Sequence, residues 1–96
     1  MVKTEEIMEK LKEVIDPELG YDVVSLGEIE EIKEENNKFI IVFLPTTPLC
    51  PFIPAILDQI EEKMNELKVD YEVEIDNETK WSLDRVNIDI KKRLGL

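Results

Sequence analysis

The 96-residue chain contains no histidine and a single cysteine, Cys50. One thiol cannot form an internal disulfide, and without histidine the chain cannot build a metal site from cysteine and histidine ligands alone. A soft metal or cluster bound to Cys50 therefore needs further ligands from another molecule. Histidine is also the usual base that activates a cysteine nucleophile, so its absence argues against a thiol enzyme.

Positive charge is scarce as well. Twelve lysines and arginines face 23 aspartates and glutamates, which gives a formal net charge of -11. A surface of this charge repels phosphate groups, so we expect no binding to nucleic acids or to anionic membranes. Protein partners should present neutral or basic surfaces to it.

Long apolar runs are missing too. None approaches the roughly 20 residues that cross a bilayer, and the first residues lack the apolar core of a signal peptide. We therefore expect a cytoplasmic protein. The apolar fraction of 43% is nevertheless that of a folded globule, and the length fits one domain over residues 1–96.

Residues 7–15 and residues 53–67 carry apolar side chains at helical spacing, which predicts two amphipathic helices. The first helix should end at Asp16, because a proline follows and disfavours the helical conformation of the residue before it. Shorter helical turns are expected over residues 83–86 and after Asn87, whose side chain can cap the second of them.

Three strands are predicted between and after these helices. Residues 28–34 alternate poorly, which favours an edge strand, and residues 38–44 are mostly apolar, which indicates burial on both faces. Between them, Asn36 and Asn37 tolerate positive φ and predict a hairpin turn. Residues 69–76 alternate strictly between apolar and acidic side chains, as in a strand with one buried face.

The resulting order of helix, strand, strand, helix, strand, helix predicts an α+β fold. We expect a two-layer sandwich in which a small three-stranded sheet carries the two long helices on one face. A KH-type RNA-binding domain has a similar order of elements, but it needs a Gly-x-x-Gly clamp and positive charge. This sequence has neither.

The segment with the most chemistry joins the apolar strand to the second long helix, and it reads Thr46-Thr47-Pro48-Leu49-Cys50-Pro51. Pro51 suits the first helical position, where a missing N–H costs nothing, so we expect Cys50 at or next to the helix N-cap. The partial positive charge there favours a thiolate and lowers the pKa of a cysteine below its ordinary value of about 8.5. Thr46 and Thr47 can donate hydrogen bonds to a thiolate or to a bound anion. The simpler alternative is that Cys50 is a small buried apolar residue.

A second polar motif, Asp16-Pro17-Glu18, follows the first helix, and Gly20 supplies a flexible turn position after it. The simplest interpretation is that Asp16 accepts hydrogen bonds from nearby backbone amides, as turn residues do. The alternative gives the carboxylates of Asp16 and Glu18 a role in a functional site. Local sequence leaves both interpretations open.

These motifs together resemble a known family. The chain resembles the iron-sulfur cluster assembly domains related to SufT and to the D component of phenylacetate degradation (PaaD). The similarity lies in Thr-Thr-Pro-x-Cys-Pro after an apolar strand, in Asp-Pro-Glu-Leu-Gly upstream of it, and in Trp81 followed by a terminal Leu94-Gly95. The resemblance covers about residues 7–96. Two positions depart from the family pattern. Ser25 stands where a second carboxylate is frequent, and Lys80 stands where a proline usually precedes the tryptophan.

The resemblance implies a role in the assembly or delivery of iron-sulfur clusters, without catalysis. It places Asp16 and Glu18 near Cys50, Thr46 and Thr47, and it makes Cys50 a metal ligand. Because a cluster takes about four ligands, a second subunit, a partner or a small thiol must complete a transient cluster. The implied partners are the iron-sulfur assembly machinery and client apoproteins, and a homodimer is one way to share the ligands.

An alternative function is that of a non-catalytic acidic adaptor in a protein assembly complex. In that role the negative surface binds a basic partner, and Cys50 is a packed, structural residue. The two hypotheses differ in the surroundings that they give to Cys50. The first needs an accessible thiolate, and the second needs a buried thiol.

Overall fold

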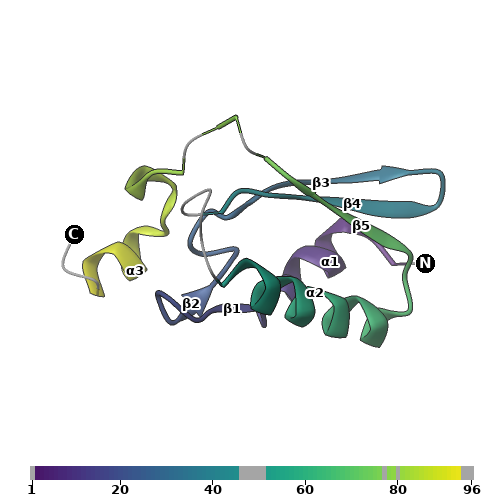
Figure 1. Ribbon diagram of the computed structural model, residues 1–96, viewed down its shortest axis with the longest axis horizontal. Helices are drawn as coiled ribbons and strands as arrows, with labels where there is room; N and C mark the ends of the chain where they lie inside the picture. Colours follow the sequence, from purple (N-terminus) through teal and green to yellow (C-terminus); the bar gives the residue numbers. More distant parts are fainter. Residues whose placement is uncertain (1, 46–51, 77, 80, 94–96) are drawn as a thin grey trace.

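The computed structural model describes residues 2–45, 52–76, 78–79 and 81–93. Their secondary structure follows the order α1 (Thr4–Leu11), β1 (Ile15–Asp16), β2 (Tyr21–Asp22), β3 (Ile29–Glu35), β4 (Lys38–Phe43), α2 (Ile53–Leu67), β5 (Tyr71–Ile75), the 3-10 helix η1 (Leu83–Arg85) and α3 (Ile88–Arg93). The predicted α+β order is confirmed, and the short β1–β2 pair is an addition to it (Figure 1). In the described part of the chain, no helix has the length and apolar character needed to cross a membrane.

The main sheet has the strand order β3-β4-β5. Strands β3 and β4 form the predicted antiparallel hairpin, whose turn residues Asn36 and Asn37 have φ angles of 51° and 66°. These angles lie in the left-handed region, which asparagine adopts more readily than most residues. Strand β5 pairs parallel with β4, and helix α2 supplies the crossover that two parallel strands require.

The core lies between this sheet and the two long helices, which Figure 1 shows on the same side of the sheet. Its fully buried members include Ile7 and Leu11 of α1, Ile56, Ile60 and Met64 of α2, and Ile41 and Phe43 of β4. Every residue of β4 from Phe39 to Phe43 is buried. Because successive side chains of a strand point to opposite faces, the predicted central strand with two buried faces is confirmed.

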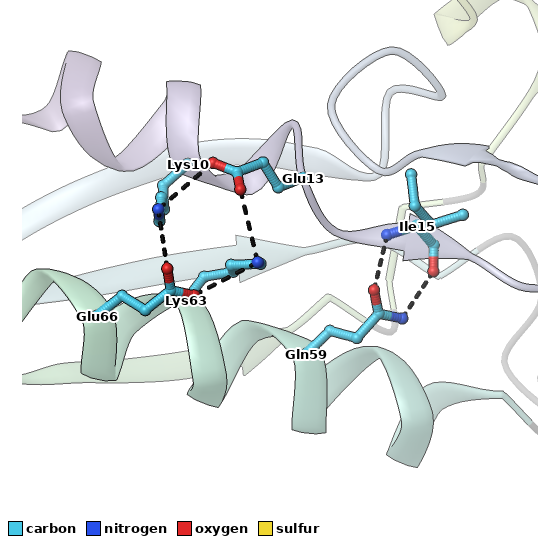
Figure 2. Close-up of polar contacts among 6 residues, drawn as sticks. All are labelled: Lys10, Glu13, Ile15, Gln59, Lys63 and Glu66. Atoms are coloured by element: carbon cyan, nitrogen blue, oxygen red, sulfur yellow. Dashed lines mark hydrogen bonds and ion pairs between the residues drawn. The ribbon is translucent and has the colours of Figure 1, made fainter.

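Helix α1 ends earlier than the apolar spacing predicts. It stops at Leu11, and the next residues lead into the two-residue strand β1, which pairs with β2. The side chain of Ile15 is 41% exposed and does not extend the apolar stripe of the helix. Two hydrogen bonds hold the extended backbone instead. The Gln59 side chain in α2 donates to the Ile15 carbonyl at 2.8 Å and accepts from the Ile15 N–H at 2.9 Å (Figure 2).

The C-terminal part of the described chain holds the turn that precedes β3. The indole N–H of Trp81 donates to the Leu26 carbonyl at 2.7 Å, and Arg85 Nε donates to the Gly27 carbonyl at 2.9 Å. Gly27 has a φ of 72°, and a Cβ there would lie 2.5 Å from Arg85, so the close approach requires glycine. Asn87 caps α3 through its side-chain oxygen, as predicted.

Candidate functional site

The structure describes part of the predicted site. Thr46, Thr47 and Cys50 lie outside the described residues, so their roles stay predictions. Asp16 and Glu18 are described, as are the residues on both sides of the segment 46–51. The site can therefore be built from the Asp-Pro-Glu turn and from the two points where that segment joins the fold.

The start of α2 corrects one expectation. The helix begins at Ile53, and its N-cap is Phe52, so it begins after Pro51 and its N-cap is not Cys50. The reason is Pro54, which lies in the first turn at a position where its missing N–H costs no hydrogen bond. The expected lowering of the Cys50 pKa by the helix N-terminus stays a prediction.

Both ends of the segment 46–51 are attached to well-packed elements. Before it, Leu44 and Pro45 are buried, and the Leu44 N–H donates to the carbonyl of Glu28 at 2.7 Å. After it, the Phe52 carbonyl accepts from the Ile56 N–H at 3.0 Å in the first turn of α2. The described residues that flank the segment therefore lie beside Glu28 and at the start of α2.

The Asp-Pro-Glu turn is closed by Asp16 itself. Its Oδ1 accepts the Glu18 N–H at 2.8 Å, and its carbonyl accepts the Gly20 N–H at 2.7 Å. The predicted local role of Asp16 in the turn is confirmed. Because Gln59 ties the preceding Ile15 to α2, the turn is anchored on the same helix that follows the segment 46–51 (Figure 2).

Asp16 also has an acidic neighbour in the interior. Asp16 and Glu28 are 0% and 1% exposed, and they are the buried charged side chains among the described residues. Asp16 Oδ2 and both carboxyl oxygens of Glu28 lack a hydrogen-bond partner in the described structure when both groups are ionised. Burial is the largest of the effects that raise the pKa of Glu28 to about 9. A hydrogen bond with Asp16, the negative charge of Asp16 and the negative charge of Glu18 raise the pKa further.

Sequence reasoning missed Glu28. It placed this residue at the start of an edge strand, and no local pattern separates it from the exposed glutamates further along β3. The contacts around it are remote in the sequence: its carbonyl accepts the Leu44 N–H, and the preceding Gly27 lies against Arg85. The one sequence feature that could have indicated a buried Glu28 is its position directly between Gly27 and the apolar Ile29.

A group of two lysines and two glutamates joins the outer sides of the two long helices, and Figure 2 shows it as a closed ring of four side chains. Lys10 Nζ lies 3.1 Å from Glu66 and 3.5 Å from Glu13. Lys63 Nζ lies 3.5 Å from Glu13 and 3.4 Å from Glu66. Each carboxylate meets two lysines, so this group links α1 to α2 and offers no unpaired charge to a ligand.

The described residues alone do not form a metal centre. Among them, no three cysteine, aspartate or glutamate side chains are grouped so that they could hold a metal ion. The carboxyl groups in this part of the site can form hydrogen bonds and bind protons. The single thiol of the chain, Cys50, is one possible ligand where an iron-sulfur cluster takes about four.

The chain combines a small α+β fold with an Asp-Pro-Glu turn and, in its sequence, a Thr-Thr-Pro-x-Cys-Pro motif. The model of the family described as iron-sulfur cluster assembly protein matches residues 4–76. The chain belongs to this iron-sulfur cluster assembly protein family. The resemblance that the sequence motifs indicate is thereby confirmed.

Individual relatives agree over nearly the whole chain. The Fe-S protein maturation auxiliary factor YitW of Bacillus subtilis is 32% identical over 95 residues, which are 96% of this chain and 93% of YitW. The Fe-S protein maturation auxiliary factor SufT of Staphylococcus aureus is 34% identical over 86 residues, which are 86% of this chain and 98% of SufT. The crystal structure of the domain of unknown function DUF59 from Bacillus anthracis is 30% identical and superposes with a TM-score of 0.88 over 97% of this chain and 92% of that one.

Proposed function

We propose that this protein is an auxiliary factor that assembles or delivers iron-sulfur clusters, with Cys50 as its own metal ligand. The observation that carries the proposal is the match over nearly the whole chain to relatives named Fe-S protein maturation auxiliary factors. Those names describe help given to other proteins. They support the role of a carrier or helper rather than that of an enzyme.

The chemistry of the chain limits how a cluster is held. One thiolate supplies one of about four ligands, so the cluster is transient and a second subunit, a partner or a small thiol supplies the others. Thr46 and Thr47 add hydroxyl donors that suit a thiolate or a sulfide. In this proposal the protein works in the cytoplasm, and its partners are the assembly machinery and client apoproteins.

The Asp-Pro-Glu turn supports the same site. Asp16 is fully buried and closes the turn, so we assign it to holding the turn in place from within. Glu18 is exposed, so its carboxylate lies at the surface of the turn, where a partner or cargo arrives. We assign neither carboxylate as a metal ligand.

Anaerobic reconstitution with ferrous iron and sulfide tests the proposal. We expect the wild type to bind both, to develop cluster absorption and to pass the cluster to an apoprotein that requires one. Cys50→Ser should bind several-fold less iron and sulfide. The chain has no second cysteine, so the matched control is wild-type protein alkylated at Cys50. Equal loading of all three proteins would contradict the role of Cys50, and the size of the loaded wild type shows whether a second subunit completes the ligands.

One observation favours the acidic adaptor as a second candidate function. A hollow beside Val42 and Ile75 is lined by five carboxylates and one lysine, Lys33, whose Nζ lies 3.6 Å from a carboxyl oxygen of Glu31. The carboxylates are those of Glu30, Glu31, Glu74, Asp76 and Glu78. A basic segment of a partner would be attracted to this hollow. If the double change Glu31→Lys and Glu74→Lys abolishes complementation in cells while Cys50→Ser does not, the adaptor function is the correct one.

A further inference from the structure

Binding of a cluster by Cys50 does not explain why Asp16 and Glu28 form a buried pair of acids. The two carboxyl groups come from β1 and from the residue before β3, and both are shielded from water. Three of their oxygens have no hydrogen-bond partner among the described residues when both groups are ionised. Two unpaired negative charges in one buried place are strongly unfavourable, so something must neutralise one of them.

No described cation does so. Arg85 from η1 lies close to this corner, but its Nε donates to the Gly27 carbonyl, and its guanidinium lies 3.8 Å from Glu30. The other charged group that acts on Glu28 is Glu18, which is negative. A proton on Glu28 resolves the problem, because a carboxylic acid can donate a hydrogen bond to the carboxylate of Asp16. The raised pKa of Glu28 agrees with this arrangement.

Glu28 also connects the Asp-Pro-Glu turn to Leu44, the residue that follows β4. Its carbonyl accepts the Leu44 N–H at 2.7 Å, just before the segment 46–51. Its side chain meets Asp16, whose other oxygen, Oδ1, holds the Glu18 N–H at 2.8 Å. One end of the Asp16 carboxylate thus closes the turn, and the other end is available to Glu28.

We propose that Glu28 is a positioning residue that holds a proton at neutral pH and shares it with Asp16, so that the acid pair fixes the Asp-Pro-Glu turn. This inference deepens the proposed function and rests on it for the functional consequence only. The shared proton and the position of the turn can be measured without any cluster.

Carbon-13 NMR of the side-chain carboxyl groups, from about pH 5 to about pH 10, tests the proton. We expect the wild-type Glu28 signal to be that of an acid at neutral pH and to titrate at about pH 9. Glu28→Gln should lose this transition. Glu34→Gln, which removes an exposed glutamate of β3, should keep it. A Glu28 signal that titrates near its ordinary value of 4.5 would overturn the proposal.

The position of the turn is tested by the carbon-detected backbone signals of Glu18, which remain visible at alkaline pH. Glu28→Gln keeps a donor to Asp16 but cannot titrate, and Glu28→Leu removes the donor. We expect wild type and Glu28→Gln to agree at neutral pH, Glu28→Leu to differ, and the wild type alone to change when Glu28 ionises. If Glu28→Leu does not fold, the pH series of wild type and Glu28→Gln decides. Glu18 signals that are unchanged across the wild-type transition would overturn the positioning role.

The same variants in the anaerobic reconstitution connect the pair to function. We expect Glu28→Gln to load and transfer clusters as the wild type does, and a folded Glu28→Leu to transfer several-fold less. Normal transfer by Glu28→Leu, with a defect in Cys50→Ser, would overturn the functional part of the inference and leave the proposed function standing. Normal loading by Cys50→Ser would contradict the proposed function instead, and the two NMR experiments would still decide whether the acid pair exists and positions the turn.

Discussion

The glutamates on the outer sides of α1 and α2 differ sharply from the acid pair in the interior. Glu13 and Glu66 are partly exposed, and each meets both Lys10 and Lys63 (Figure 2). Asp16 and Glu28 are buried, and neither forms an ion pair within the described ranges of the chain. The outer group balances its charges in water, where such pairs contribute little to stability and are weakened by salt.

In the buried pair, by contrast, no cation from the residues that the structure describes neutralises the two carboxyl groups, and burial makes their charges costly. Glu28 occupies a place where an apolar side chain of similar size would avoid all cost of desolvation. For this reason we relate Glu28 to the turn that it is proposed to position and not to a gain in stability. We therefore expect substitutions in the two regions to respond differently to pH, with the apolar core between sheet and helices setting the scale of the largest effects.

Ile60→Ala in α2 should have the largest effect. Ile60 is fully buried in the core, so its truncation should cost about 2 to 5 kcal/mol of unfolding free energy. Ile88→Ala is the matched control, because Ile88 is 66% exposed and the same truncation should stay within about 0.5 kcal/mol. Denaturant titration measures both changes. Equal shifts in the two variants would show that the core is not where the structure places it.

Glu28→Gln should have the next largest effect, and that effect should depend on pH. In the folded protein the pKa of Glu28 is about 9, whereas in the unfolded chain the group ionises near 4.5. Between these values the folded state holds one more proton than the unfolded state, so wild-type stability falls as pH rises and levels off above about pH 9. Glutamine does not titrate, so the advantage of the variant should grow through this window by at most about 1.4 kcal/mol per pH unit.

Unfolding curves at several pH values, with Glu34→Gln alongside, check this dependence. The exposed control removes the same charge and should show no comparable trend. A difference between Glu28→Gln and wild type that stays constant from about pH 5 to about pH 9 would mean that Glu28 ionises normally in the folded protein. The contrast between the two acidic regions would then disappear.

The parts of the fold that were predicted correctly depend on local patterns. The apolar run of β4, the Asn36-Asn37 turn and the spacing in α2 each report their own structure, because period and turn chemistry act over a few residues. The Asp-Pro-Glu turn was predicted for the same reason, since Asp16 reaches an amide only two residues away.

The features that sequence reasoning missed depend on distant residues. Ile15 leaves the helical stripe because its backbone bonds to Gln59, 44 residues further along the chain. Glu28 is buried where its carbonyl bonds to Leu44 and the preceding Gly27 lies against Arg85, and its own sequence neighbours do not reveal this. A pattern of single residues cannot show which glutamate of an acidic strand faces the interior, so the acid pair could be found only from the structure.

Glu66→Gln in the outer group should have the smallest effect, and its sign with pH should be opposite to that of Glu28→Gln. Hydrogen bonds from Lys10 and then Lys63 lower the pKa of Glu66. A carboxyl group with a lowered pKa in the folded state adds stability above its unfolded pKa and loses it as pH falls through the folded value. The variant should therefore be slightly less stable than wild type at neutral pH and equal to it in acid.

Salt separates this effect from a loss of packing. The four side chains are partly exposed, so added salt should screen the ion pairs and remove most of the difference between Glu66→Gln and wild type. Glu62→Gln, an exposed change on the same helix, corrects for the altered net charge. A Glu66→Gln defect that persists at high salt and in acid would show that the ring of Figure 2 holds the helices by packing. The difference between the outer group and the buried pair would then not be due to their charges.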